Sequence, residues 1–382
     1  MLQQSKKIRK YQDINQSKKE NYQRQNIGEF DSEIYQEFSE FDFDELAIFF
    51  DPLEQYVYIN NGGFTTIDWK NPDALKTLTQ AILIVKFKLK YWDIPNMSLC
   101  PTVPSRLNYL QWIKQSFLEN ILTEEQNQDD KDLLNILQNQ EKQIKGIDIG
   151  TGSNLIYALL GVKKYNWHMT ATEIEENSYN NARIIIEKNN LENSIQLIHN
   201  IKKNKDKQFT IFDEVIDKSQ YYMFSLCNPP YFSQKQDRNV FNNQFVKNQN
   251  MEENEFVTEG GEVQFIKQMI QESKNFANNI LIFTSLVGVK QHFFQIKDYL
   301  KQEQQNQQIA QFFTARFKQG KNFRWGVAWT FYKDLKFHNL GKFIDEEELR
   351  TFQNNMNQNM QTGLESFDNQ NQQNQWPKKI KL

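Results

Sequence analysis

The sequence lacks long apolar runs and is poor in the residues that build covalent or metal-linked frameworks. Its 382 residues contain no run of about 18 apolar residues, the length that a membrane-spanning helix needs. The N-terminus, MLQQSKKIRK, lacks the apolar segment of a secretory signal. Only two cysteines, Cys100 and Cys227, occur, and the four histidines show no ligand spacing. We therefore expect a soluble intracellular protein with no disulfide, no metal site and no membrane contact.

Negative charge is in slight excess overall, but it is unevenly distributed. The formal net charge is -3, yet residues 1–26 carry a net charge of +5, which leaves -8 for the remainder. A basic arm on a mildly acidic body is typical of proteins that contact phosphate groups. The alternative is a solvated polar tail with no partner.

Low-complexity segments set the domain limits. We assign residues 1–26 as a basic flexible arm and 338–382 as a low-complexity tail, because neither contains enough apolar surface to fold. The polar stretches 123–143 and 233–256 are interpreted as insertions, since loops of that length are uncommon in a compact domain.

Between these segments, short apolar runs alternate with amphipathic ones. Strands are predicted at 145–150, 167–174, 194–199, 221–227, 279–285 and 326–332, and helices at 176–190, 261–276 and 290–302. This alternation predicts an α/β fold with a mainly parallel, helix-covered sheet over residues 144–337. Ahead of it, residues 27–118 are predicted to form a mainly helical subdomain, with the clearest helices at 73–87 and 106–117.

The first strand runs into a glycine turn, GIDIGTGSN, at 146–154. Gly150 and Gly152 lie where strand becomes helix, so backbone amides can approach a ligand with no Cβ in the way. The next strand ends at Glu173, a position from which an acid accepts hydrogen bonds from ribose hydroxyls. The pair suggests a cofactor that contains adenosine. The alternatives are a purely structural turn and an acid that only stabilises a helix N-terminus, a role open also to Glu175 or Glu176.

The fourth strand runs into CNPPYF at 227–232. Two prolines hold the chain rigid at the carboxyl edge of the sheet, where such folds bind ligands. The side-chain carbonyl of Asn228 and the main-chain carbonyl of Pro229 are placed to accept the two N–H bonds of an adenine amine, and Tyr231 or Phe232 offers a face for stacking an extruded base. On its own the tetrapeptide is equally consistent with a strand-ending turn.

Six segments in order resemble the methyltransferase-like protein 16 family, the adenine-N6 methyltransferases of U6 small nuclear RNA, within the class I methyltransferases. They are CPTVPSRLNYLQWI at 100–113, GIDIGTGSNLIYALLG at 146–161, ATEIEENSYNNA at 171–182, CNPPYF at 227–232, TEGGEVQFIK at 258–267 and QGKNFRWGVAWTFY at 319–332. The resemblance implies a Rossmann-like core with a seven-stranded, mainly parallel sheet and helices on both faces.

The resemblance also implies site residues. S-adenosyl-L-methionine is expected to contact Arg106, Gly150, Glu173 and Asn228, with Arg106 directed at the methionine carboxylate. Asn228, Pro229, Pro230 and Tyr231 are expected to be catalytic residues that form the base pocket, next to Phe232 as a substrate-binding residue. In the basic arm, RNA phosphates are expected to contact a group of basic residues that includes Lys6, Lys7, Arg9 and Lys10.

These inferences predict an enzyme that methylates N6 of an extruded adenosine in structured RNA, with U6 small nuclear RNA as the expected substrate. The alternatives are methylation of ribosomal RNA adenine, methylation of protein glutamine, and a non-catalytic RNA-binding relative. We expect a monomer. The ending WPKKIKL contains a short basic cluster that suggests localisation in the nucleus.

Overall fold

The computed structural model describes residues 42–96, 98–119, 143–201, 210–213, 215–230, 260–319 and 322–333, together with residues 30, 33, 335, 337, 340 and 341. These residues lie within one compact unit, Glu29–Lys342. The predicted arm, the two insertions apart from residue 143, and nearly all of the tail fall outside the described residues.

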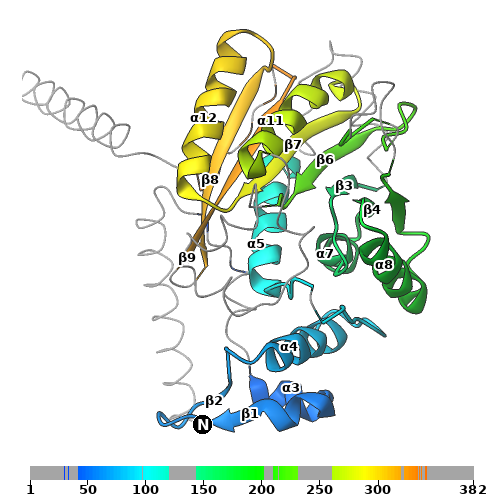
Figure 1. Cartoon of the computed structure of the whole chain (residues 1–382), viewed down its shortest axis with the longest axis vertical. Helices are drawn as coiled ribbons and strands as arrows, with labels where there is room; N and C mark the ends of the chain where they lie inside the picture. Colours follow the sequence, from blue (N-terminus) through cyan, green and yellow to red (C-terminus); the bar gives the residue numbers. More distant parts are fainter. Residues whose placement is uncertain are drawn as a thin grey trace, which may run out of the picture. The chain divides into compact units, whose positions relative to one another are not determined.

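A seven-stranded sheet organises the fold (Figure 1). Its strands, in spatial order, are β5 (Ile195–His199), β4 (His168–Glu173), β3 (Lys145–Ile149), β6 (Tyr222–Cys227), β7 (Ile280–Val287), β9 (Asn322–Thr330) and β8 (Gln311–Gln319). The first five are parallel, whereas β9 runs antiparallel to β7 and β8 antiparallel to β9. The predicted mainly parallel α/β sheet is confirmed, and all six predicted strands are present. Strand β8 was not predicted.

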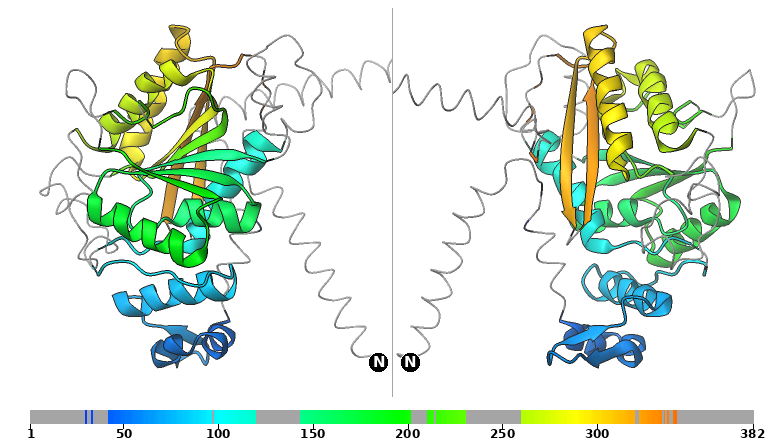
Figure 2. Two further views of the ribbon diagram at one scale, coloured as in Figure 1. Left: turned by 90° about the vertical axis from the view of Figure 1, so that its right-hand side faces the viewer. Right: turned by 60° about the vertical axis from the view of Figure 1, so that its left-hand side comes forward.

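Helices cover both faces of this sheet (Figure 2). One face carries α5 (Val103–Ile113), α7 (Ile156–Tyr165) and α8 (Glu176–Asn189), and the other carries α11 (Gly261–Ser273) and α12 (Lys290–Gln305). In α11 the buried Ile266, Met269 and Ile270 recur at intervals of three and four residues, which is the spacing of one helix face turned to a core. Strands β3, β4, β6 and β7 are therefore buried along nearly their whole length, whereas the edge strand β5 is only partly buried.

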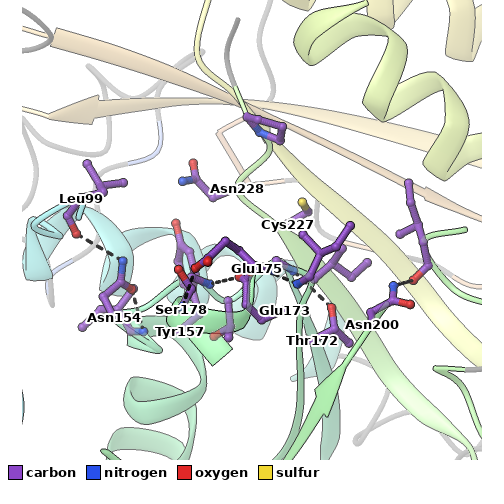
Figure 3. A pocket seen from close by; sticks show the side chains of 18 of the residues that line it. Leu99, Asn154, Tyr157, Thr172, Glu173, Glu175, Ser178, Asn200, Cys227 and Asn228 are labelled. Atoms are coloured by element: carbon purple, nitrogen blue, oxygen red, sulfur yellow. Dashed lines mark hydrogen bonds between the residues drawn. The ribbon is translucent and has the colours of Figure 1, made fainter. Parts of the chain in front are cut away.

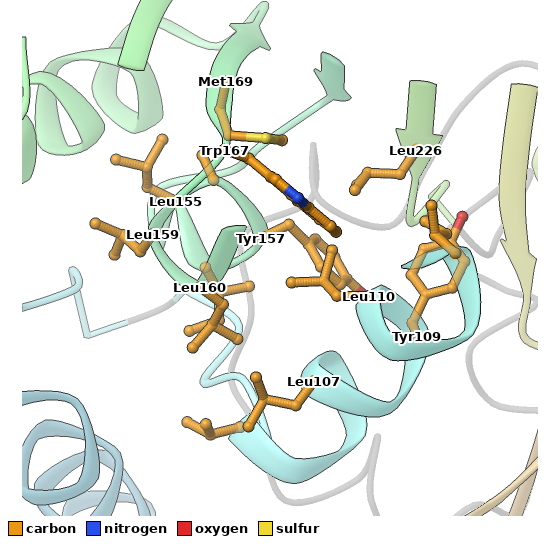
Figure 4. Close-up of a cluster of buried hydrophobic side chains, with 14 of the residues drawn as sticks. Leu107, Tyr109, Leu110, Leu155, Tyr157, Leu159, Leu160, Trp167, Met169 and Leu226 are labelled. Carbon is orange, nitrogen blue, oxygen red and sulfur yellow. The ribbon is translucent and has the colours of Figure 1, made fainter. Parts of the chain in front are cut away.

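An aromatic core joins α5 to α7 and the sheet (Figure 4). The Tyr109 hydroxyl lies 2.7 Å from the hydroxyl of Thr284 on β7, within hydrogen-bond distance. Trp167 packs edge-on against Phe224 with ring centroids 4.8 Å apart. Glycine is required at position 146, because a Cβ there would lie 2.2 Å from the Phe224 ring. The Tyr109 ring also packs edge-on against that of Tyr157 on α7, with ring centroids 5.7 Å apart, so α5 is fixed against both α7 and the sheet.

Residues 42–118 contain α3 (Phe43–Phe49), the 3-10 helix η1 (Asp51–Tyr56), the antiparallel pair β1 (Val57–Ile59) and β2 (Thr65–Ile67), α4 (Pro72–Val85), α5 and the π-helical turn η2 (Lys114–Leu118). The helices expected at 73–87 and 106–117 correspond to α4 and to α5 with η2. A separate helical subdomain over 27–118 is not confirmed, because the buried side chains of this region belong to the same core cluster as those of α7 and the sheet. Within the described ranges, no helix is long and apolar enough to cross a membrane.

Candidate active site

The pairing register brings three predicted site residues to one edge of the sheet. Ile149 of β3 pairs with Thr172 of β4 and with Cys227 of β6. Because the three strands are parallel, their carboxyl ends are level. The residues that follow these three positions in the chain are Gly150, Glu173 and Asn228.

A cavity of about 530 Å³ opens at this edge (Figure 3). Pockets for cofactors and other small ligands typically measure about 300 to 1,000 Å³. All four predicted cofactor residues line it, together with Pro230 of the predicted base pocket. Pro229 is buried and is not among the lining residues. Six predicted site residues fall outside the described residues, so their roles stay predictions: Tyr231, Phe232, Lys6, Lys7, Arg9 and Lys10.

The glycine turn presents its backbone to the cavity. Gly150 and Gly152 both have φ of +66°, a left-handed conformation that side chains disfavour. A Cβ built on Gly150 would meet no atom within 4 Å, so it would project into open space. The Gly150 N–H donates to the Thr172 hydroxyl at 3.2 Å, which ties the turn to the neighbouring strand. The space that a side chain would fill is thus left to a ligand.

Glu173 is held by backbone donors on two sides. Its Oε2 accepts the Gly152 N–H at 2.8 Å, and its Oε1 accepts the N–H groups of Ile174 and Glu175 at 2.8 and 2.9 Å. Burial raises the pKa of Glu173, and these three hydrogen bonds oppose that rise. A carboxylate has about four acceptor positions, so capacity remains for a ligand hydroxyl.

The helix-capping role belongs to Glu175. Its side chain accepts the N–H groups of Asn177 and Ser178 at the start of α8, at 3.0 and 2.6 Å. Although burial acts to raise the pKa of Glu175, these hydrogen bonds outweigh it and the pKa is lowered. A neighbouring residue therefore supplies the N-terminal acid, and Glu173 is available at the cavity.

Arg106 reaches the cavity from the first turn of α5. Its Nη1 donates to the Tyr157 hydroxyl at 3.0 Å, and its guanidinium carbon lies 5.5 Å from the centre of that ring. Tyr157 belongs to α7, which follows the glycine turn. An arginine that reaches the cavity in this way can bind a carboxylate there.

Sequence reasoning did not single out several other residues that line the cavity. They are Leu99, Asn154, Tyr157, Thr172, Ser178, Asn200, Ile211 and Phe265. Two of them, Thr172 and Asn200, could have been predicted from the sequence, because they stand at or just after the ends of adjacent parallel strands. Asn200 is anchored in place, since its Nδ2 donates to the Thr210 carbonyl at 3.0 Å and its own N–H to the Glu173 carbonyl at 2.7 Å.

These features fit S-adenosylmethionine in both chemistry and size. A buried carboxylate suits a ribose diol, an arginine suits a carboxylate, and the open space beside Gly150 lets a ligand approach the backbone. By this fit Glu173, Arg106 and the glycine turn would hold the cofactor. Asn228 stands on the adjoining strand end, where the methyl acceptor would enter.

Comparison with known proteins assigns the family. A model of a family described as RNA methyltransferase matches residues 34–333. The chain belongs to this family of RNA methyltransferases.

Relatives and solved structures agree with this assignment. The ribosomal RNA large subunit methyltransferase F of Christiangramia forsetii is 33% identical over 302 residues, covering 76% of this chain and 96% of the relative. The U6 small nuclear RNA (adenine-(43)-N(6))-methyltransferase of Drosophila pseudoobscura pseudoobscura is 33% identical over 301 residues, covering 76% and 89%. The human METTL16 catalytic domain in complex with the MAT2A 3′UTR hairpin 1 aligns with a TM-score of 0.62 and 29% identity, over 77% of this chain and 93% of that one. The N-terminal domain of human METTL16 in complex with SAH aligns with a TM-score of 0.56 and 29% identity, over 76% and 94%.

The family membership confirms several predictions made from sequence. The chain is a class I methyltransferase that uses S-adenosylmethionine, and it is an enzyme of the RNA adenine-N6 methyltransferase class. The resemblance to the methyltransferase-like protein 16 family is confirmed as well. The RNA that it modifies is a separate question.

Proposed function

We propose that this enzyme methylates N6 of an unpaired adenosine in U6 small nuclear RNA. The observation that carries the proposal is a shared cavity: Asn228 and Pro230 line the same space as Gly150 and Glu173. An acceptor for an amine and a binding place for a methyl donor therefore adjoin each other. The Drosophila relative named above acts on U6 RNA by its name, and this chain matches 89% of its length.

The proposed chemistry depends on positioning. S-adenosylmethionine supplies an electrophilic methyl group on a sulfonium. The adenine amine is a weak nucleophile, because its lone pair is delocalised into the ring. The Asn228 side-chain carbonyl and the Pro229 main-chain carbonyl would accept its two N–H bonds and favour the pyramidal geometry that attacks the methyl carbon. Formation of the new N–C bond would accompany cleavage of the S–C bond of the methyl donor, and the excess proton would leave to solvent. No covalent enzyme intermediate is needed.

Large-subunit ribosomal RNA is a second candidate substrate. The bacterial relatives named ribosomal RNA large subunit methyltransferase F match this chain over 90% or more of their own length, at 31% to 33% identity in the first three. The U6 RNA enzyme from Drosophila matches equally well. The two groups of relatives thus share this catalytic body and differ in the RNA that their names state.

The test is to incubate the purified protein with labelled S-adenosylmethionine and total RNA, separate the RNA by size, and map the labelled adenosine. Label in U6 RNA supports the proposal. Label in large-subunit ribosomal RNA would instead support the second candidate substrate. Cofactor binding without label in any RNA would overturn both.

Three further properties belong to the proposal and need their own measurements. The arm that includes Lys6, Lys7, Arg9 and Lys10 would add salt-dependent RNA affinity without sequence preference. The basic cluster at the end of the chain would direct the enzyme to the nucleus, where a tagged copy should be found. Sedimentation should give the mass of a monomer.

A further inference from the structure

A strap, residues 90–101, connects α4 to α5 and lies against the glycine turn. The structure describes all of the strap except residue 97. On one side α4 holds it: the Lys76 ammonium donates to the Ile94 carbonyl at 2.8 Å, and Gln80 donates to the Trp92 carbonyl at 3.2 Å. Trp92 and Ile94 are buried. The strap is therefore a fixed part of the core, and it ends beside the cavity at Leu99.

On its other side the strap is hydrogen-bonded to the glycine turn itself. The Trp92 indole N–H donates to the Asn154 carbonyl at 2.9 Å, and the Asn154 amide donates back to the Leu99 carbonyl at 3.3 Å. Figure 3 shows the second of these bonds at one end of the cavity. Both Asn154 and Leu99 line the cavity, so this junction is part of its wall.

The turn that the strap contacts is strained. Leu155 has φ of 53° and ψ of 22°, a left-handed conformation, although it is neither glycine nor asparagine and its side chain is fully buried. Such a conformation costs about 1 to 2 kcal/mol and persists only where surrounding contacts impose it. The turn between Gly152 and α7 thus depends on its neighbours for its shape.

A side chain of α8 also joins the strap to the turn. The amide nitrogen of Asn181, on α8, donates to the Asp93 carbonyl in the strap at 2.9 Å and to the Ser153 carbonyl in the turn at 2.7 Å. Both of its hydrogens are used, and both acceptors are backbone groups. Ser153 is fully buried and stands between two residues that line the cavity, Gly152 and Asn154.

We propose that Asn181 is a positioning residue for cofactor binding, because its amide fixes the strained glycine turn to the strap. Gly152 in turn donates the hydrogen bond that orients Glu173. Loss of the Asn181 amide would let the turn relax, and the Gly152 N–H would move away from the carboxylate. Asn181 itself is not among the residues that line the cavity, so it acts through the turn.

The test measures binding of S-adenosylhomocysteine to the full chain by calorimetry, together with steady-state methylation. Two hydrogen bonds of ordinary strength support an expected rise of about tenfold in Kd for Asn181→Ala. The KM for S-adenosylmethionine should rise with it, while kcat at saturating cofactor and RNA binding without cofactor stay near the wild-type values. Asn180→Ala is the matched control, since Asn180 is on the same helix and, among the described residues, its side chain only accepts a hydrogen bond from the exposed Arg183, at 3.4 Å.

Two further variants separate positioning from a general loss of stability. Asn181→Asp keeps the shape but removes the donor, and its cofactor affinity should recover in part as the pH falls, because a protonated carboxyl can donate again. Trp92→Phe removes the indole donor to the same turn while keeping a ring in place. If both side chains fix one turn, the double variant with Asn181→Ala should deviate from additivity in its cofactor affinity.

The outcomes distinguish this proposal from the function on which it depends. A wild-type protein that does not bind S-adenosylhomocysteine would overturn the cofactor assignment. If the wild type binds S-adenosylhomocysteine and both Asn181→Ala and Asn180→Ala bind it with the wild-type Kd, the positioning role alone is overturned. A loss of kcat at unchanged KM, strictly additive effects with Trp92→Phe, or an affinity of Asn181→Asp that does not respond to pH would also overturn it.

Discussion

The backbone N–H of Gly152 donates a 2.8 Å hydrogen bond to Oε2 of Glu173, and this bond joins the ends of two neighbouring strands. It links the glycine turn after β3 to the acid at the end of β4, so the two features that suggested an adenosine cofactor form one structural unit. Burial raises the pKa of Glu173, while the Gly152 N–H and two further backbone N–H groups favour the ionised form. The carboxylate is oriented before any ligand arrives.

Replacing this carboxylate by an amide should weaken cofactor binding. In Glu173→Gln, an amide nitrogen replaces one of the two carboxylate oxygens. This nitrogen cannot accept a hydrogen bond from a backbone N–H group, so at least one of the present hydrogen bonds is lost. A hydrogen bond that involves a charged group contributes about 1.5 to 3 kcal/mol, so we expect Kd for S-adenosylmethionine to rise at least about tenfold. Calorimetric titration measures this Kd, and Glu176→Gln, at the exposed first residue of α8, is the control. Equal affinity in the two variants would contradict the assigned role.

Asn228 should be needed for methyl transfer and dispensable for RNA binding. Removal of its side-chain carbonyl in Asn228→Ala takes away one of the two proposed acceptors for the adenine amine. Removing a comparable fixed polar group at other active sites costs about 100- to 1,000-fold in kcat. Transfer of labelled methyl to RNA and a gel-shift titration of the same RNA measure the two properties separately, with Asn180→Ala as the control. Turnover at the wild-type rate would refute the proposed mechanism.

Three of the site residues that the sequence pattern itself indicated stand at the end of a strand or directly after it, whereas Arg106 was expected from the family resemblance. Gly150, Glu173 and Asn228 each come at the end of an apolar run, and parallel strands place such positions at one edge. The partners of these residues were not predictable in the same way. Asn181 meets residues 28 and 88 positions away along the chain, and Trp92 meets Asn154 at a separation of 62. Such pairings depend on packing rather than on local pattern.

For the fold as well, local sequence pattern predicted some elements and missed another. Strands β6 and β7, with the sequences YMFSLC and ILIFTSLV, are buried along their whole length and appear in the sequence as nearly continuous apolar runs. Strands β3 and β4, KGIDI and HMTATE, are also buried along nearly their whole length but contain more polar residues. Strand β8, with the sequence QFFTARFKQ, mixes apolar with charged residues because it stands at the edge of the sheet. Its apolar residues are interrupted by Arg316 and Lys318, so it lacks the nearly continuous apolar run that marks β6 and β7.

A methyl group at position 150 should block the cofactor with little effect on the fold. Gly150→Ala would place a Cβ in the open space of the cavity and would hold a non-glycine residue at φ +66°, at a cost of about 1 to 2 kcal/mol. We expect the protein to fold and its affinity for S-adenosylhomocysteine to fall at least about tenfold, by analogy with other steric blocks of a backbone contact. Gly63→Ala is a close control, since Gly63 has φ of +77° and also no atom within 4 Å of its Cβ, but lies in the β1–β2 turn. A similar loss of affinity in both variants would show that backbone strain, and not a steric block of the cofactor, causes the effect.

Because of Asp148, the free energy of unfolding should depend on pH between 3.8 and about 7. Burial raises its pKa from 3.8 to about 7, although the Thr151 hydroxyl, which donates to Oδ2 at 2.7 Å, opposes the rise. Because the folded form then binds more protons than the unfolded form between these two values, the free energy of unfolding attributable to this group falls as the pH rises from 3.8 to about 7 and is constant above that. Asp148→Asn keeps an acceptor for Thr151 and removes the titration. The variant should therefore match the wild type near pH 4 and exceed its melting temperature at pH 8, by an amount that corresponds to at most a few kcal/mol. Melting temperatures of both proteins across this range provide the measurement, and a difference between them that does not change with pH would show that Asp148 does not titrate there.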